Sequence, residues 1–188
     1  MALDLDALTG YVDRDLDADL ARWLADRPPV KIPRKTRPIK PFLPRLPPAA
    51  ATALTAFDRR VRSGTMPNFL DIADWSYGFD FAANDCTLVD ADYETPLTDD
   101  DVYSLGADGS GSLYVLLTNG QVATWFHEEE VVEGDTRFDN LDVFLWSAVR
   151  HQAVRAGTLP LAAVEEDFLS LNQPGALAPE LGLLHSMR

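Results

Sequence analysis

The stretch from residue 104 to residue 130, "SLGADGSGSLYVLLTNGQVATWFHEEE", decides the fold of this chain. Its two apolar runs predict strands near Ser112–Thr118 and Gln121–Phe126. The pair Asn119-Gly120 between them is typical of a two-residue type I′ hairpin turn. Asp108–Gly111, before the first run, predicts another tight turn, because glycine readily adopts positive φ. The stretch therefore predicts successive antiparallel hairpins.

The same glycines and acids do not fit a phosphate loop or a metal site. A phosphate loop leads into the N-terminus of a helix and usually carries a lysine, whereas here a strand follows and Asp108 would repel phosphate. The run from His127 into three glutamates suggests metal ligands. However, the three histidines, His127, His151 and His185, have none of the spacings of a zinc or iron site. We therefore expect no metal and no cofactor.

The single cysteine, Cys86, could form a nucleophile pair with His127 or His151. Its surroundings, "AANDCTLVD", predict a strand running into the core, where a lone cysteine usually serves as a small apolar filler. No catalytic triad, metal cluster or cofactor loop is evident in the sequence. We therefore expect that the protein is not an enzyme and has no catalytic residues.

Helical patterns flank the predicted hairpins on both sides. Residues 15–26 place Leu16, Leu20, Trp23 and Leu24 on one face, and residues 49–62 predict a helix that Gly64 would end. A further helix begins near residue 141, where Asp139 or Asn140 can cap it, and residues 159–171 form one more amphipathic helix. Residues 68–106 predict loops and short strands. Apolar residues recur at helical spacing just before and within the helix that begins near residue 141, and we expect them to face inward. They are Phe138, Leu141, Leu145, Ala148 and Val149.

Composition and charge fit a single domain of 188 residues with 46% hydrophobic content. The formal net charge of −14 makes nucleic acid and anionic membranes unfavourable partners. One cysteine excludes an intrachain disulfide framework. The first ten residues carry acids where a secretory signal has basic residues, and no run approaches the ~20 apolar residues of a membrane span. We therefore expect a soluble, cytoplasmic protein.

The chain divides by composition into a basic, proline-rich strap and an acidic remainder. Residues 27–48 hold seven basic residues, eight prolines and no acid, which leaves nine basic residues against thirty acids elsewhere. Proline at this density favours extended chain. The strap could lie across its own acidic body, act as a partner-binding arm, or bind nucleic acid. The expected units are an acidic N-terminal helix (1–26), the strap (27–48), an α+β domain (49–156) and a C-terminal helical extension (157–188).

The order of elements from residue 46 to residue 154 resembles the SUKH superfamily, the family of a fungal cell-wall-synthesis regulator and of many bacterial immunity proteins. The resemblance is distinct only from residue 102 to residue 146, and the helix at 49–62 and both terminal extensions depart from the family pattern. It implies an α+β fold with a central, mostly antiparallel twisted sheet and flanking helices. The matching residues are Asp108, Gly109, Gly111, Tyr114, Leu116, Gly120, Val122, Trp125, His127, Glu128, Phe138, Leu141, Phe144 and Leu145.

Bacterial members of that family typically bind and neutralise a polymorphic toxin, often a nuclease, so the resemblance implies a non-enzymatic immunity protein. The block Asp99–Asp101 could be a solvated loop or part of an acidic face for a basic partner. A regulatory or scaffold module that docks through the strap is the alternative. The expected partner-binding residues are the acids Asp99, Asp100, Asp101, Glu128, Glu129, Glu130 and Glu133, with Trp75, Tyr77 and Tyr93 as aromatic anchors.

Overall fold

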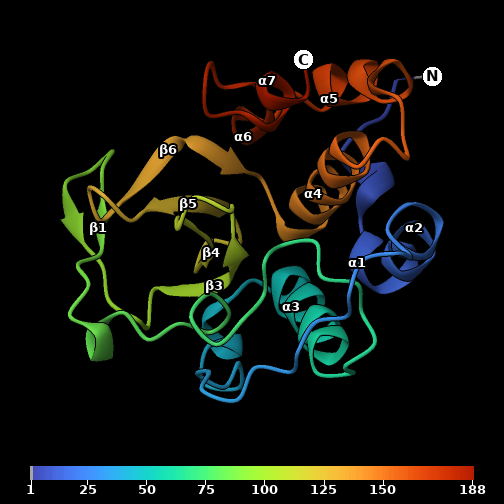
Figure 1. Cartoon of the computed structure of the whole chain (residues 1–188). Helices are drawn as coiled ribbons and strands as arrows, with labels where there is room; N and C mark the ends of the chain where they lie inside the picture. Colours follow the sequence, from blue (N-terminus) through green and yellow to red (C-terminus); the bar gives the residue numbers. More distant parts are fainter. Residues whose placement is uncertain (1) are drawn as a thin grey trace.

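Six strands form one curled sheet at the centre of the computed structural model, which describes residues 2–188 (Figure 1). Their spatial order is β2-β1-β6-β5-β4-β3, and every neighbouring pair is antiparallel except β1 and β6, which run parallel. The predicted α+β class with a mostly antiparallel sheet and flanking helices is confirmed. The strands are β1 (Val89–Asp90), β2 (Thr95–Pro96), β3 (Val102–Ala107), β4 (Leu113–Leu117), β5 (Val122–Phe126) and β6 (Val131–Phe138).

Helices pack beside one face of the sheet, with α3 and α4 next to it and the N-terminal helices behind them (Figure 1). The α-helices are α1 (Tyr11–Arg14), α2 (Leu16–Trp23), α3 (Pro48–Val61), α4 (Leu141–Arg155), α5 (Glu165–Leu171), α6 (Pro174–Leu177) and α7 (Leu183–Met187). Short 3₁₀ turns are η1 (Asp6–Leu8), η2 (Leu43–Arg45), η3 (Ala82–Asn84) and η4 (Leu161–Ala163). The helix predicted at 15–26 is present as α2, which is shorter than expected and follows a separate one-turn helix, α1. The single helix predicted at 159–171 is two shorter pieces, η4 and α5.

Alternate residues of the strands enter two apolar cores, because successive side chains of a strand point to opposite faces of a sheet. Tyr103 and Leu116 join the larger core, which also includes side chains of α1 to α7. Val102 and Val115 join a smaller core on the other face, which Phe81 from the segment before β1 helps to close. Both faces of the sheet are therefore covered by other parts of the same chain.

The predicted turns on either side of β4 are present, but one differs in type. Between β4 and β5, the amide of Gly120 donates to the carbonyl of Leu117, and the amide of Leu117 donates to that of Gln121. Gly120 has φ of 89°, whereas Asn119 is not among the residues with positive φ. A type I′ turn needs positive φ at both central residues, so that prediction was wrong. The loop is a three-residue type I turn followed by a left-handed glycine.

The helix α4 begins as predicted, with Asn140 as its cap. The side chain of Asn140 accepts a hydrogen bond from the amide of Val143 at 2.9 Å, which satisfies a donor that the first turn leaves free. One turn of this helix also holds the N-terminal segment, because the carboxylate of Asp142 accepts from the amides of Gly10 and Val12. The N-terminal segment thus packs on α4, which also packs beside the sheet.

The strap lies along the body rather than apart from it. The amide of Val30 donates to the carbonyl of Met66, and the amide of Arg37 donates to that of Gly78, both at 2.8 Å. Phe42 is only 4% exposed and belongs to the larger core. These contacts agree with the interpretation of a strap that packs across its own protein.

Arg37 is the residue that fastens the strap to the sheet. Its guanidinium donates to the carbonyls of Phe79 at 3.0 Å, Asp99 at 2.6 Å and Val102 at 2.9 Å. The same group lies 5.4 Å from the centre of the Tyr103 ring, whose hydroxyl donates back to the carbonyl of Arg37 at 2.6 Å. One charged side chain thus satisfies three backbone acceptors next to edge strand β3.

Replacing Arg37 by methionine should therefore destabilise the fold strongly. Arg37→Met keeps an unbranched apolar side chain but leaves three half-buried carbonyls without their donor, so the free energy of unfolding should fall by about 2–4 kcal/mol. Urea denaturation measures this difference. Lys40→Met, at an exposed cation of the same strap, is the matched control and should change stability by less than ~0.5 kcal/mol. Equal effects of the two substitutions would contradict this role of Arg37.

The contact between α4 and α7 should make stability depend on pH. His151 lies with its Nε2 2.8 Å from the hydroxyl of Ser186, and burial, aided by Arg155, lowers its pKa from 6.5 to about 4. The folded state thus holds a neutral ring that the unfolded chain protonates below pH 6.5, so stability is full above that pH and is lost as pH falls toward 4.

We expect this histidine to account for about 1–2 kcal/mol of the stability lost between about pH 7.5 and about pH 5. His151→Gln should remove that part of the pH dependence, as measured by urea denaturation at the two pH values. His185→Gln, at the exposed histidine of α7, should leave the pH dependence unchanged. A His151→Gln profile parallel to that of the original chain would show that the ring does not titrate in this range.

Candidate functional site

Most of the exposed candidate residues lie along the edge of the sheet where β1 pairs with β6. The parallel pairing aligns Val89 with Val131 and Asp90 with Val132, so the tip that joins β1 to β2 lies beside the middle of β6. That tip carries Asp92, Tyr93 and Glu94, all exposed. Tyr93 is 75% exposed, the most of any large hydrophobic side chain in residues 2–188.

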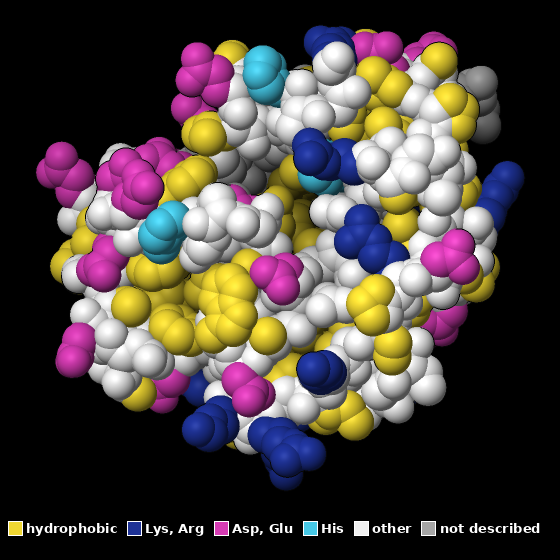
Figure 2. All heavy atoms as spheres, in the orientation of Figure 1, with side chains coloured by type: hydrophobic (Ala, Val, Ile, Leu, Met, Phe, Trp, Pro, Cys, Tyr) yellow, Lys and Arg dark blue, Asp and Glu magenta, His cyan; other side chains and the backbone are white. Residues whose placement is uncertain are grey.

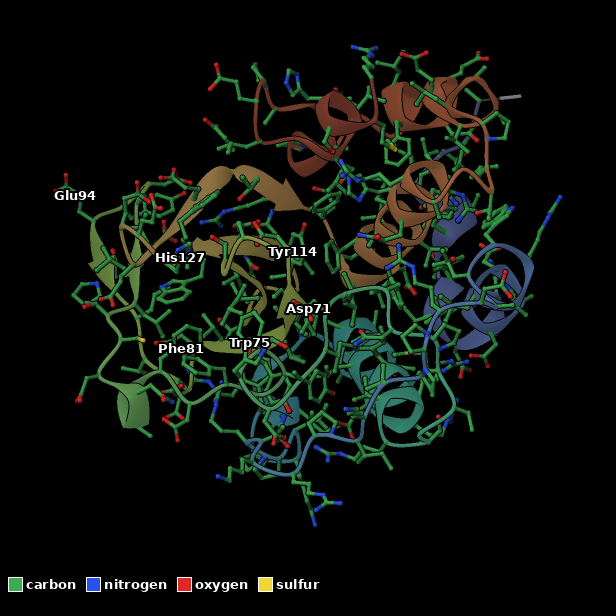
Figure 3. All side chains as sticks on the ribbon, viewed as in Figure 1. Asp71, Trp75, Phe81, Glu94, Tyr114 and His127 are labelled. Atoms are coloured by element: carbon green, nitrogen blue, oxygen red, sulfur yellow. The ribbon has the colours of Figure 1, made fainter. Side chains whose placement is uncertain are left out.

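The turn between β5 and β6 adds further acids to this edge. Glu128 and Glu129 are exposed next to His127 in the turn. Figure 2 shows acidic side chains gathered over the β1 and β6 side of the molecule, and Figure 3 shows Glu94 extending outward from it. We call this surface the acidic face; its members are Asp92, Tyr93, Glu94, Glu128, Glu129, Glu133 and Asp135.

One cation lies beneath the acidic face and holds the β1–β2 hairpin against β6. The guanidinium of Arg137 lies 3.0 Å from the carboxylate of Asp90 and 3.7 Å from that of Asp92, and it also donates to Gln121. Its Nε is the one buried side-chain polar atom without a partner among the described residues. Arg137 therefore neutralises part of the face from below and leaves the outward carboxylates uncompensated.

A glycine on β6 allows this close approach. A Cβ built on Gly134 would lie 1.9 Å from a carboxylate oxygen of Asp92, which no side chain could tolerate without a shift of the hairpin. Gly134 thus brings the carboxylate of Asp92 directly over the backbone between Glu133 and Asp135. The tip of the β1–β2 hairpin therefore packs directly on β6 at Gly134.

Glu130 has a structural role in the same turn. It has φ of 56°, and its carboxylate accepts a hydrogen bond from the amide of Thr87 at 2.8 Å. Hydrogen bonds from Thr87 hold the pKa of Glu130 below its ordinary value. Of the four glutamates predicted on β5–β6, Glu130 is therefore the one whose carboxylate is used inside the protein.

Two of the predicted acids outside the acidic face form ion pairs with arginines of the same chain. Asp99 lies 3.5 Å from Arg37 and accepts the amides that begin η3, while Asp101 lies 3.2 Å from Arg45. Only Asp100 of this block is exposed. The sequence left open whether this block is a solvated loop or binds an external basic partner. For Asp99 and Asp101 the basic partners are arginines of the strap.

The predicted aromatic anchors do not lie together. Tyr77 has no exposed surface; its hydroxyl donates to Asp58 at 2.7 Å and its ring packs on Phe57 and Tyr103. The expectation of Tyr77 as a surface anchor was therefore wrong, because the segment around it completes the core beside β3. Trp75 is 46% exposed, but it lies by the strap and not on the acidic face (Figure 3).

Groups that could carry chemistry are separate in the structure. Cys86 lies in a loop after η3 rather than in the predicted strand, and burial raises the pKa of its thiol. His127 contacts Ser112, with Nδ1 3.3 Å from a hydroxyl on a residue only 2% exposed. Within residues 2–188 no three His, Cys, Asp or Glu side chains are placed to hold a metal ion. In the same range no helix has the length and apolar character needed to span a membrane.

Three acids of the face, Asp92, Glu94 and Asp135, were missed by the sequence analysis. Each lies in a short polar segment that resembles many exposed turns, and only the parallel pairing of β1 with β6 brings the segments together. That pairing joins strands 41 or more residues apart in sequence without a helix between them, so no local pattern announces it. The sequence did show Tyr93 between two acids, but it did not indicate which other residues lie beside that tyrosine in the fold.

Comparisons with known proteins give no further assignment. No family model matches this chain, and neither a curated protein nor a solved structure matches it.

Removing the cation beneath the acidic face should loosen the hairpin. Arg137→Met leaves the half-buried carboxylate of Asp90 without a charge partner, so we expect about 2–4 kcal/mol of destabilisation and faster amide exchange in β1 and β2. Hydrogen exchange with mass spectrometry resolves the two strands. Arg155→Met, at an arginine with no ion pair among residues 2–188, should leave that exchange unchanged. Unaltered exchange in Arg137→Met would contradict this anchoring role.

Proposed function

We propose that this chain is a non-enzymatic immunity protein that binds and neutralises a cognate toxin through the acidic face. The observation that supports this most is the exposed Tyr93 among the six acids of the acidic face, five of which are exposed. An exposed aromatic with a charged rim is the usual composition of a binding hot spot. The chemistry of the surface suits a basic partner.

A basic nuclease is the kind of toxin that fits this surface best. A nuclease must attract phosphate, so its cleft carries lysine and arginine, and an array of carboxylates can occupy that cleft in place of nucleic acid. Opposite charges also accelerate the encounter, which matters when a toxin must be neutralised quickly. Such a complex would form in the cytoplasm, where nucleic acid is the target.

The SUKH resemblance concerns residues that build the fold, and not the residues proposed to contact the toxin. Several matching residues are turn or core positions here: Asp108 and Gly109 begin the β3–β4 turn, and the Tyr114 and Phe144 rings stand 4.8 Å apart. Of the matching residues, only Glu128 belongs to the acidic face. The proposed contact therefore rests on surface chemistry that is particular to this chain.

The alternative of a scaffold module that docks through a free strap has less physical support. A docking peptide must be released to enter a groove, and release would break the three hydrogen bonds of the Arg37 guanidinium and expose Phe42. Trypsin should accordingly cut slowly between Arg34 and Arg45. Rapid cleavage there in the intact chain would revive the scaffold function.

The immunity proposal predicts a specific loss of protection. It predicts that a toxic domain is encoded beside this gene; expression of that domain should arrest growth, and co-expression of this chain should restore it. Glu128→Lys with Glu129→Lys should weaken binding at least about tenfold and abolish the rescue, because two exposed carboxylates would repel the basic cleft. Calorimetric titration measures the affinity.

Asp26→Lys with Glu166→Lys changes the net charge equally at exposed positions on the helical side of the molecule (Figure 1). This control should retain binding and rescue, with only a small loss of association rate. Equal losses in both double variants would reduce the effect to overall charge, and full rescue by the Glu128 and Glu129 variant would refute the assigned surface.

A further inference from the structure

The strap presents cations that the body does not use. Of its seven basic residues, Arg27, Arg37 and Arg45 bond to the body through Gln152, backbone carbonyls and Asp101. The other four are exposed, and within the described chain their side chains form no ion pair or hydrogen bond; they are Lys31, Arg34, Lys35 and Lys40. An acidic protein thus keeps a small basic patch, which lies at the lower edge of Figure 2 with acidic side chains beside it.

An apolar groove of about 790 Å³ lies between these cations. Its walls are formed by Ile32, which is 47% exposed, and Trp75, which is 46% exposed, with Lys31 and Arg34 at the rim. Asp74 also lines it, but the amides of Arg34 and Lys35 both donate to its carboxylate. The groove therefore combines exposed apolar surface with the cations Lys31 and Arg34, whose charge the Asp74 carboxylate offsets in part.

The backbone beside the groove is also free. Residues 31 and 32 lie outside any helix or strand, and their peptide groups form no hydrogen bond with any other part of residues 2–188. Edge-like backbone next to an apolar groove can accept an extended segment through main-chain hydrogen bonds. An occupant should thus offer an extended or hairpin backbone, one large apolar side chain and negative charge.

The acidic hairpin of this same protein has all three properties. Tyr93 is 75% exposed at the tip between β1 and β2, and it lies between the exposed carboxylates of Asp92 and Glu94. Figure 3 shows Glu94 at the far side of the sheet from Trp75, so a single molecule does not fill its own groove. Every copy therefore carries an unfilled groove and a segment of complementary chemistry.

We propose that the groove of Ile32 and Trp75 receives the acidic hairpin of a second copy of this chain. The Tyr93 ring would enter between Ile32 and Trp75, with the Glu94 carboxylate facing Lys31 and Arg34. Because the two surfaces differ, the contact is head-to-tail and can propagate into short open chains of copies. A hairpin tip buries little area, and each copy carries a net charge of −14, so the association is weak and reversible.

This contact does not depend on the proposed toxin function, although a toxin bound to the acidic face would compete with it for Tyr93. A polyanion such as nucleic acid is the other class of ligand that a basic groove suggests. It is less favoured because a polyanion offers no single large apolar side chain for the space between Ile32 and Trp75, whereas the hairpin offers Tyr93.

Sedimentation equilibrium over a range of protein concentrations tests the proposal. At about 150 mM salt, which screens the repulsion between two copies of net charge −14, the average mass should rise with concentration above the 20.8 kDa of one chain. Lys31→Glu should raise the dissociation constant at least about tenfold, while Lys40→Glu, an equal charge change outside the groove, should have little effect.

Two double variants distinguish a head-to-tail contact from any other. Lys31→Glu with Arg34→Glu reverses the charge at the rim of the groove, and Tyr93→Ser with Glu94→Lys removes the aromatic ring and reverses the charge at the hairpin tip. All four positions are exposed, so unchanged circular dichroism and urea midpoints should confirm that both variants fold. Each variant alone should be monomeric. Their equimolar mixture should form a dimer and nothing larger, because it supplies one intact groove and one intact hairpin.

Several results would overturn the proposal. A monomer at every concentration in about 150 mM salt, or association that both double variants retain, would exclude this contact. A mixture of the two variants that stays monomeric would also exclude it. The nucleic-acid alternative would be favoured instead if a single-stranded oligonucleotide bound, quenched Trp75 fluorescence and lost affinity in Lys31→Glu while the protein remained monomeric.

Discussion

The guanidinium of Arg37 is the interaction on which the arrangement of this protein depends. Strand β3 is the last strand of the sheet, and its outer edge would be an open template for aggregation. The segment at Tyr77–Phe79 covers that edge, with the amide of Gly78 donating to Ser104, and Arg37 binds the segment, the loop before β3 and β3 itself. A proline-rich strap cannot form a strand ladder of its own, so one side chain with several donors fastens it.

Local sequence signals were sufficient for the elements whose cause is local. The apolar alternation of β4 and β5, the turn before β4 and the Asn140 cap of α4 were all predicted within a residue or so. The turn at Asn119-Gly120 was located correctly but assigned the wrong type, because the same dipeptide suits both a type I′ turn and a left-handed glycine after a type I turn. The type of turn depends on how many residues lie between the last paired positions of the two strands, and the dipeptide alone does not determine that number.

Features that depend on distant pairing were beyond the sequence. The acidic block at 99–101 suggests an external basic partner, yet Asp99 and Asp101 are partly neutralised by arginines more than fifty residues earlier in the chain. Conversely, Asp92 and Asp135 attracted no attention separately and become neighbours only through the parallel β1–β6 pair. Proline content and net charge indicated that the strap and body attract each other, but not which of the seven cations the body would use.

The distribution of used and unused charge separates structure from binding in this protein. Carboxylates and cations that hold the fold are half-buried and paired, as at Arg37, Arg137 and Arg150, whose partners include Asp99, Asp90 and Asp19. Among residues 2–188 only one acid of the acidic face lies near a cation, Asp92 at 3.7 Å from Arg137, and the other acids of the face have no cation within ion-pair distance. Arg137 thus holds the hairpin against β6 from beneath, and the exposed carboxylates beside it are positioned by the fold without being used to stabilise it.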